Sequence, residues 1–311
     1  MVTTAGAPVH RGVALGLWAP LAEDVVPTAV AELAALGATD VALVVPWRAA
    51  DVHAIEIAPG PVTPSDDAVG AAIEAARARG LAVTVFPILM LDKVAPGQWR
   101  GTLAPTDVDA FWTSYERFIL HYAALAHRHG AAALLVGSEL GSTEGWRDRW
   151  FHLIGRARRL FRGRLLYSAN WDHYRQVSFW ARLDGIGVTG YFELTTDDDA
   201  SVATLAAAWR AARDPLVATA RTLGKPLWLT EVGYVSRDGA TRAPWDYLRK
   251  TRIDLEEQRR AYAALIEAWS GVPELAGLFA WEWSGAGGPT DGGYTPRGKP
   301  AACALAAWFG G

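Results

Sequence analysis

The chain has 311 residues, of which 51% are hydrophobic and 20% charged, a composition that excludes an intrinsically disordered protein. Its 30 basic and 33 acidic side chains give a formal net charge of −3 without a block of Lys and Arg, so we expect no nucleic acid partner. No apolar run approaches the ~18 residues of a membrane-spanning helix, so we expect no membrane partner either.

The N-terminal residues lack the features of an export signal, because no basic segment there precedes an apolar run. We therefore expect a cytoplasmic protein from this sequence, and a secreted protein if a leader has been removed from it. The single cysteine, Cys303, excludes an intrachain disulfide bond. The sequence leaves the oligomeric state open.

Short apolar runs alternate with longer stretches of helical periodicity, a pattern typical of repeated βα units around a parallel sheet. The predicted strands are Val13–Trp18, Asp40–Trp47, Leu81–Leu89, Ala132–Glu139, Leu165–Trp171, Gly185–Phe192, Leu227–Tyr234 and Leu275–Trp283. The predicted helices include Val25–Leu36, Asp66–Arg79, Asp107–His129, Trp146–Phe161, Val202–Leu223, Leu255–Ser270 and, as the eighth, Pro300–Trp308. We expect eight strands and eight helices.

These units continue without a linker or a break in composition, which favours one closed barrel over a doubly wound sheet with a second domain. No G-x-G-x-x-G motif follows the first predicted strand, so a dinucleotide-binding domain is not indicated. The sequence therefore predicts an α/β protein, a single (β/α)8 TIM barrel over residues 1–311. Residues 1–11 are expected to form a loose N-terminal segment.

Two glutamates lie at the ends of predicted strands. Glu139 closes the fourth apolar run and Glu231 lies near the end of the seventh, so both belong to the barrel mouth, where such barrels carry their active sites. A carboxyl in an apolar strand is costly to bury, and the alternative for each is an ion pair with an arginine. A facing pair is typical of glycoside hydrolases, in which one carboxyl donates a proton and the other attacks the anomeric carbon.

Other residues at the predicted mouth are candidates for substrate binding. Trp18 ends the first strand, and Arg48 follows the second, where a cation could keep the nucleophile ionised. Asn170 and Trp171 end the fifth strand, and Asp291 lies on a mouth loop where it could bind sugar hydroxyls. The alternatives are a surface arginine, a capped turn and ordinary core aromatics.

Metal chemistry is not indicated. His127 and His129 lie at the end of a predicted outer helix and have no third ligand at a suitable spacing. We predict no metal ion and no organic cofactor.

Several segments share their order and spacing with one known enzyme family. They include Trp99-Arg100-Gly101, Gly137-Ser138-Glu139-Leu140, Ser168-Ala169-Asn170-Trp171-Asp172, Tyr191-Phe192, Thr230-Glu231-Val232-Gly233-Tyr234 and Gly293-Tyr294-Thr295-Pro296-Arg297-Gly298-Lys299-Pro300. On these segments the chain resembles glycoside hydrolase family 113, from Trp18 to Pro300. That family belongs to a clan of barrel hydrolases whose acid/base and nucleophile lie on strands four and seven.

The resemblance implies a retaining hydrolase that works by double displacement, with Glu139 as general acid/base and Glu231 as nucleophile. It implies β-1,4-mannan or manno-oligosaccharides as substrates and no cofactor. By the same resemblance Tyr191 orients the nucleophile, and Trp281 forms the floor under the sugar that is cleaved. The alternative for both aromatic residues is a place in the core.

Three positions depart from the pattern of the family or its clan. Phe86-Pro87-Ile88 stands where the family has a Lys-Pro-His segment, and Ala280 replaces the first of two adjacent tryptophans. Ser138 precedes the acid/base, where most of the wider clan has Asn. Two alternatives therefore stay open: a β-glycosidase of different sugar specificity, and a carbohydrate-binding barrel without catalysis.

Overall fold

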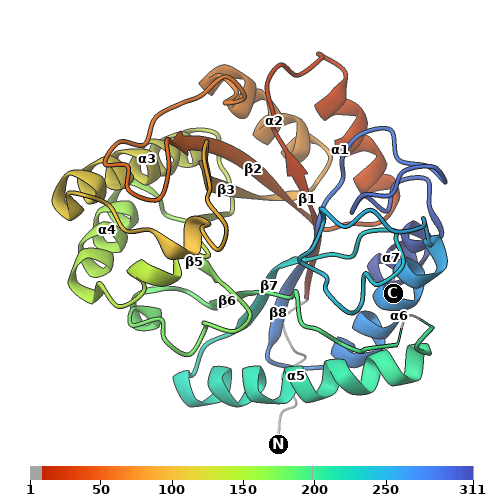
Figure 1. Cartoon of the computed structure of the whole chain (residues 1–311). Helices are drawn as coiled ribbons and strands as arrows, with labels where there is room; N and C mark the ends of the chain where they lie inside the picture. The colour runs from red at the N-terminus through yellow and green to blue at the C-terminus, as the bar shows by residue number, and fades with distance from the viewer. Residues whose placement is uncertain (1–8, 198, 311) are drawn as a thin grey trace, which may run out of the picture.

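The computed structural model describes residues 9–197 and 199–310. Eight parallel strands close into a barrel in sequence order, which confirms the predicted fold (Figure 1). The strands are β1 (His10–Gly16), β2 (Asp40–Ala49), β3 (Ala82–Leu91), β4 (Ala133–Ser138), β5 (Arg164–Ala169), β6 (Ile186–Thr189), β7 (Leu227–Val232) and β8 (Leu275–Ala280). The candidate site residues therefore follow strands of a closed barrel.

Helices surround the strands (Figure 1). They are α1 (Val25–Ala35), α2 (Asp66–Ala78), α3 (Val108–Arg128), α4 (Arg147–Leu160), α5 (Val202–Leu223), α6 (Leu255–Trp269) and α7 (Pro300–Phe309). The expected count of eight was wrong for the described residues, since β5 and β6 are joined by loops around the 3-10 turn η3 (Trp180–Arg182). Phe179 fills this place in the outer layer, because its ring stacks on Trp150 at 4.4 Å and meets Tyr167 edge-on at 5.1 Å.

Alternate strand residues form two apolar layers. Along β1, Val13 and Leu15 pack outward against the helices, and Ala14 packs inward. The inner layer consists of Ala14, Ala42, Val44, Phe86, Ile88, Leu135, Leu166, Trp228 and Phe279. The barrel interior is therefore a packed core, and a substrate has to bind at the mouth above it.

Several strands end earlier than predicted. β4 ends at Ser138 and β5 at Ala169, so the candidate residues Glu139 and Asn170 are the first residues of the following loops. β1 begins earlier than predicted, at His10, which pairs with Gly277 of β8. Part of the segment expected to be loose is therefore a strand, and residues 1–8 lie outside the described residues.

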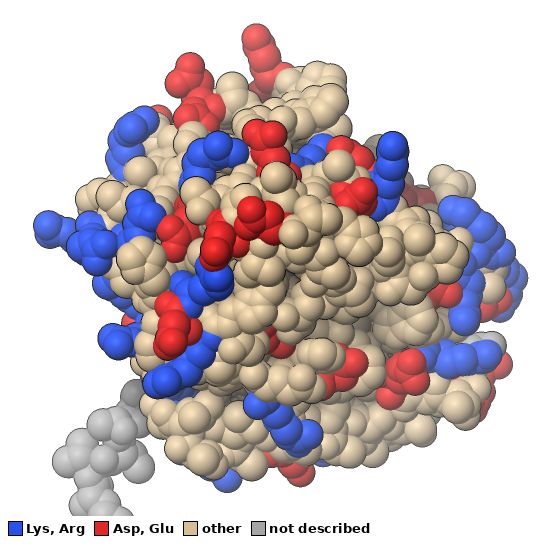
Figure 2. Space-filling model, turned by 60° about the vertical axis from the view of Figure 1, so that its left-hand side comes forward, with Lys and Arg blue, Asp and Glu red and all other residues tan. Residues whose placement is uncertain are grey.

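The surface carries both signs of charge. On the face in Figure 2, Lys and Arg side chains are interspersed with Asp and Glu. Among the described residues, no helix combines the length and the apolar character needed to cross a bilayer.

Candidate active site

The inward direction of the site residues depends on two irregularities in the strands. Between Leu229 and Glu231, β7 advances two residues while β6 advances one, from Val188 to Thr189. This bulge leaves Thr230 as an extra residue, so Thr230 and Glu231 both face the interior and the next residue returns to the outer layer. Regular alternation would have turned Glu231 toward the helices.

β4 carries a similar irregularity between Leu135 and Ser138, where it advances three residues against two on β5. As a result Ser138 faces inward, and Gly137 faces the helices. A Cβ atom at Gly137 would lie 2.5 Å from Oη of Tyr115, so only glycine fits there. The irregularity in β4 therefore turns Ser138 into the barrel and brings Glu139, the next residue, toward the mouth.

Glu231 is buried and accepts hydrogen bonds from both sides. Oγ of Ser138 donates to its Oε1 at 3.1 Å, and Oη of Tyr191 donates to its Oε2 at 3.3 Å. The contact expected of Tyr191 is therefore present. Because Ser138 precedes Glu139 in the chain, its bond to Glu231 also brings the two glutamates to one place.

Glu139 follows β4 with a φ angle of +54°, a left-handed conformation that is uncommon for residues other than glycine. Such backbone conformations gather at functional sites. Its backbone N–H donates to the carbonyl of Ser168 at 2.7 Å. Its Oε2 accepts a hydrogen bond from Nη2 of Arg100 at 2.5 Å, and the Glu139 side chain is only 9% exposed.

The pKa values of Glu231 and Arg100 depend on the neighbouring charges. Burial, and then the charge of Glu139, raise the pKa of Glu231 to about 8, whereas Arg100, Ser138 and Tyr191 act to lower it. Burial acts to lower the pKa of Arg100, but the two carboxylates outweigh it and the pKa is raised. The site therefore places a permanent cation beside two buried carboxyls, one of which, Glu231, has a raised pKa.

The aromatic candidates Trp18 and Trp281 are partly buried and pack against the inner apolar layer. Trp281 meets Phe86 edge-to-face at 6.3 Å, so it covers the inner core on the mouth side. A Cβ atom at Gly233 would lie 2.4 Å from the carbonyl oxygen of Trp281, so glycine is required for this close approach. These positions suit the predicted contacts with a sugar ring.

The residues of β3 and β8 that depart from the family pattern lie in different layers of the barrel. Phe86 and Ile88 belong to the inner layer, so the polar groups that the family has at these positions are absent from the interior here. Ala280 belongs to the outer layer, against the helices. Its side chain therefore does not replace a mouth-facing tryptophan.

Two charged candidates have partners away from the glutamates. Arg48 donates from Nε to the carboxylate of Asp92, so the cation beside the two glutamates is Arg100 rather than Arg48. Asp291 accepts from the buried Nζ of Lys299 at 3.1 Å and from the backbone N–H of Gly293 at 2.7 Å. Roles in substrate binding for Arg48 and Asp291 stay predictions.

The β5 candidates form part of the rim. Asn170 donates to Asp172 at 2.7 Å and accepts from Oγ1 of Thr189 at 3.3 Å. Trp171 packs against the outer layer, with its ring 5.5 Å from that of Phe192. These contacts are those of a capped turn and a rim aromatic, and substrate binding by either residue stays a prediction.

Two residues of the site were missed by the sequence analysis. Arg100 lies within a segment that matches the family pattern, but no strand-end position marked its side chain. Tyr294 lies with its ring 6.2 Å from that of Tyr191, and its Oη donates to the carbonyl of Pro244 at 2.5 Å. Both residues come from loops, whose approach to the glutamates has no periodic signal in the sequence.

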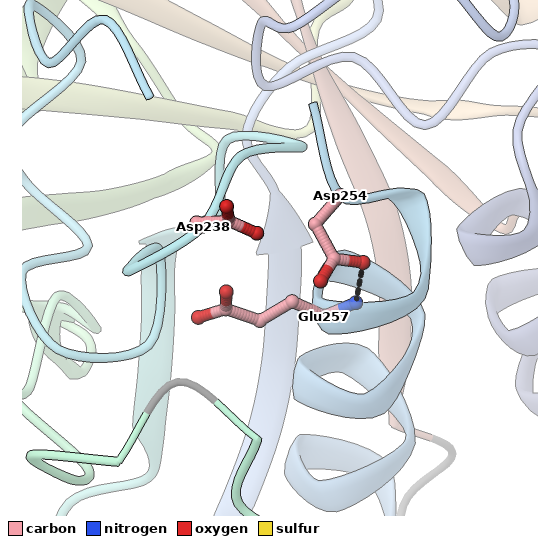
Figure 3. Close-up of side chains that lie close together, drawn as sticks. All are labelled: Asp238, Asp254 and Glu257. Carbon is pink, nitrogen blue, oxygen red and sulfur yellow. Dashed lines mark hydrogen bonds between the residues drawn. The ribbon is translucent and has the colours of Figure 1, made fainter. Parts of the chain in front are cut away.

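Three carboxylates of the loop after β7 and the start of α6 lie close together, as in a metal site: Asp238, Asp254 and Glu257 (Figure 3). Their oxygens already accept hydrogen bonds. Asp254 caps the N-terminus of α6 through the N–H groups of residues 256 and 257, and Glu257 accepts from the N–H groups of residues 239 and 241. Asp238 pairs with Arg252. The cluster is therefore explained as a brace for the loop after β7.

A surface hollow of about 600 Å³ lies elsewhere, between α5 and the turn after α6. Its lining includes the ion pair of Arg221 with Glu274, at 2.6 Å. Neither glutamate of the mouth borders it. The candidate active site rests instead on the facing carboxyls.

Comparison with known families agrees with this geometry. The model of glycoside hydrolase family 113 matches residues 19–293, which include both mouth glutamates. The chain belongs to glycoside hydrolase family 113. It is therefore a glycoside hydrolase, and the enzyme class predicted from the paired glutamates is confirmed. A comparison with curated proteins finds no match.

Solved structures of this family share the fold over almost the whole chain. The GH113 β-mannanase AaManA from Alicyclobacillus acidocaldarius, in complex with ManMIm, is 29% identical, with 98% of each chain covered and a TM-score of 0.87. A GH113 β-1,4-mannanase is 22% identical over 98% of this chain and 99% of that chain, with a TM-score of 0.86. The β-glucuronidase of Faecalibacterium prausnitzii is 14% identical, with a TM-score of 0.67, and shares the fold over 49% of its chain.

Proposed function

We propose that this family 113 enzyme cleaves β-1,4-linked mannan or manno-oligosaccharides with retention of configuration, using Glu231 as nucleophile and Glu139 as general acid/base. The observation that carries the assignment is the convergence of both carboxyls on one set of partners. Ser138 joins the two strand ends through its bond to Glu231, and Arg100 contacts Glu139 while its charge acts on both. The similar mannanase from Alicyclobacillus acidocaldarius supports the choice of sugar.

The reaction proceeds in two displacements. In the first, a carboxylate oxygen of Glu231 bonds to the anomeric carbon, the glycosidic C–O bond breaks, and Glu139 donates its proton to the leaving oxygen. In the second, Glu139 takes a proton from water, the water oxygen bonds to the anomeric carbon, and Glu231 leaves as a carboxylate. Each step inverts the anomeric carbon, so the product keeps the starting configuration.

The surrounding residues suit this chemistry. Tyr191 donates a hydrogen bond to Oε2 of Glu231, and Ser138 donates one to Oε1, so the two carboxylate oxygens have different partners. Trp281 offers a partly exposed indole at the mouth, and apolar C–H faces of a pyranose pack well on such a surface. We place the sugar that is cleaved between Trp281 and the carboxyl pair, with Trp18 beside it.

Replacement of the nucleophile tests the catalytic assignment. We expect Glu231→Ala to lose at least ~10³-fold in kcat on an aryl β-mannoside or on manno-oligosaccharides, because no group then forms the covalent intermediate. Azide should restore turnover and give an α-glycosyl azide, since it attacks from the face that Glu231 occupied. Unchanged turnover in Glu231→Ala would contradict the assignment.

The substrate specificity is tested in a separate experiment. Aryl β-mannoside, β-glucoside and β-galactoside are compared with manno-oligosaccharides at equal enzyme concentration, and products from mannohexaose are separated by length. We expect cleavage of the manno-configured substrates only. Cleavage of another β-glycoside in place of these substrates would agree with a glycoside hydrolase but contradict the choice of mannan as its substrate.

A further inference from the structure

The turn that carries Glu139 is held by β5 at two consecutive peptides. The backbone N–H of Glu139 donates to the carbonyl of Ser168 at 2.7 Å. The N–H of the next residue, Leu140, donates to the side chain of Tyr167, 2.9 Å from its Oη. Because Glu139 has a left-handed backbone conformation, the peptides on its two sides set the direction in which its side chain leaves the turn. Two neighbouring residues of β5 therefore fix the start of the Glu139 side chain.

Tyr167 approaches this turn from the outer layer of the barrel. Its side chain is fully buried there, and its ring meets those of Trp150 and Phe179 edge-on at 5.2 and 5.1 Å. Burial raises the pKa of Tyr167 well above its usual value, so the phenol stays protonated. Its Oη therefore has one proton to donate, in addition to the lone pairs that accept from the N–H of Leu140.

Glu144 accepts that proton. It follows the 3-10 turn η2 (Gly141–Thr143), its side chain is only 1% exposed, and its Oε1 lies 2.8 Å from Oη of Tyr167. Burial raises the pKa of Glu144, whereas the bond from Tyr167 and the nearby His173, whose Nδ1 lies 3.6 Å from Oε2, act to lower it. A buried carboxyl is costly, and an apolar side chain would fill the same space without that cost. The cost points to a role for the acceptor oxygen beyond packing.

The backbone of Glu144 is fixed by the loop that takes the place of a helix between β5 and β6. The carbonyl of Glu144 accepts from Oγ of Ser178 at 2.6 Å and from its N–H at 3.3 Å. On the other side, Thr143 binds the carbonyl of Leu140 through its Oγ1 at 2.9 Å and its N–H at 2.8 Å. The Glu144 carboxyl therefore has a fixed base, and it commits the proton of Tyr167 to one direction. The lone pairs of that hydroxyl then face Leu140.

We propose that Tyr167 and Glu144 are positioning residues for the acid/base Glu139. Glu144 orients the hydroxyl of Tyr167, this hydroxyl holds the N–H of Leu140, and the peptide fixed in this way directs the Glu139 side chain toward the glycosidic oxygen. Arg100 contacts the far end of the same side chain, so it does not fix the backbone from which that side chain starts. The proposal rests on the role of Glu139 proposed above and adds two residues that lie behind its turn.

A displaced acid slows a glycosidase to an extent that depends on the leaving group. The glycosidic bond of an oligosaccharide breaks to give a sugar hydroxyl, whose oxygen needs a proton from the acid as it leaves. A 2,4-dinitrophenolate leaves as a stable anion, so the same step on its glycoside needs no acid. General acid catalysis contributes about 10²–10⁴-fold, and imperfect placement loses part of this factor. A role in positioning Glu139 therefore predicts a loss that is confined to the poorer leaving group.

The test compares kcat/KM of the full chain on mannotetraose and on the 2,4-dinitrophenyl β-glycoside of mannobiose. In Tyr167→Phe we expect a loss of about tenfold on mannotetraose and of less than about twofold on the dinitrophenyl substrate. Glu144→Leu should give the same difference between the substrates, because the hydroxyl loses its acceptor. Glu144→Gln keeps an acceptor oxygen and should restore most of the wild-type value on mannotetraose. In the double variant Tyr167→Phe with Glu144→Leu the losses should not add.

Tyr115→Phe is the matched control. Tyr115 is also a buried tyrosine whose ring packs on Trp150, at 5.7 Å, but its Oη donates to the carbonyl of Val136 within β4, at 2.7 Å. Its replacement removes one hydrogen bond from the same aromatic cluster and leaves the bond to Leu140 in place. We therefore expect lower stability and an equal change in kcat/KM on the two substrates.

Amide hydrogen exchange gives a second readout, which needs no turnover. The N–H of Leu140 should exchange at least about tenfold faster in Tyr167→Phe than in the wild type, and at the wild-type rate in Tyr115→Phe. The proposal is overturned if Tyr167→Phe and Glu144→Leu change both substrates equally or not at all, or if this exchange rate is unchanged in Tyr167→Phe. If Tyr167→Phe does not fold, Glu144→Leu serves as the test, since it keeps the tyrosine. A wild type that cleaves neither substrate would instead contradict the proposed function.

Discussion

Tyr191 donates a hydrogen bond to Oε2 of Glu231 at 3.3 Å, linking the loop after β6 to the end of β7. The phenol is buried, and burial, followed by the charge of Glu231, raises the pKa of Tyr191 well above its usual value. Tyr191 therefore stays protonated and can only donate to the carboxylate. The bond favours the ionised form of Glu231, which is the form that the proposed attack on a sugar requires.

Tyr191→Phe should lower kcat by about tenfold, because the loss of one hydrogen bond to a charged group is worth about 1.5 kcal/mol. The same bond lowers the pKa of Glu231, so its removal should move the acid limb of kcat/KM to higher pH. Initial rates on manno-oligosaccharides across pH measure both effects. Tyr247→Phe is the control, since Tyr247 is 63% exposed. An unchanged acid limb would show that the bond does not act on the nucleophile.

Glu231→Gln should stabilise the fold at alkaline pH. Burial and the charge of Glu139 raise the pKa of Glu231 to about 8 in the folded state. Between its unfolded pKa of about 4.3 and pH 8 the folded chain binds more protons than the unfolded chain, so stability falls as pH rises. Without this group the free energy of unfolding at pH 8 should be higher by about 2–4 kcal/mol.

Denaturant unfolding across pH measures this difference. The control is Glu56→Gln, whose side chain is 76% exposed and which should change stability by less than about 0.5 kcal/mol. A Glu231→Gln curve parallel to that of the wild type would contradict the raised pKa. A gain of this size would fit the proposed role of Glu231 as nucleophile, because such a residue is retained for function at the expense of stability.

Asp291→Asn separates a structural role from substrate binding. Asp291 accepts from the buried Lys299, so its neutralisation should lower the free energy of unfolding by about 3 kcal/mol with little change in KM. In the double variant with Lys299→Met the losses should not add, because the two groups share one interaction. A KM raised several-fold without loss of stability would instead favour the sugar contact predicted from the sequence.

Glu257→Gln should weaken the brace of the loop after β7. Glu257 is 1% exposed and accepts bonds from the N–H of Gly239 at 2.9 Å and from the N–H and Oγ1 of Thr241 at 2.8 Å. We expect the free energy of unfolding, measured with denaturant, to fall by about 1–3 kcal/mol. Glu256→Gln, at an exposed neighbour paired with Arg259, is the control. Calcium or a chelator should leave Tm unchanged, and a calcium-dependent rise in Tm that Glu257→Gln abolishes would reveal a metal site.

Strand periodicity was sufficient to predict the barrel and the place of its mouth. Eight apolar runs with helices between them and no linker favoured one closed barrel over a doubly wound sheet, and Glu139 and Glu231 marked the ends of the fourth and seventh. The helix count failed between β5 and β6 because Phe179 covers the core there without a helix. Aromatic packing of this kind depends on Trp150, a residue far away in the sequence.

Chemical type and position along the chain were thus enough to single out Glu139 and Glu231, the pair that we propose to be catalytic. Its inward direction depends on bulges in β4 and β7, which add a residue to one strand relative to its neighbour and so reverse the side-chain alternation. The choice of Arg100 over Arg48 as the cation beside Glu139 likewise depends on how loops fold across the mouth. Both features depend on contacts between residues far apart in the sequence, and local secondary-structure propensity does not describe such contacts.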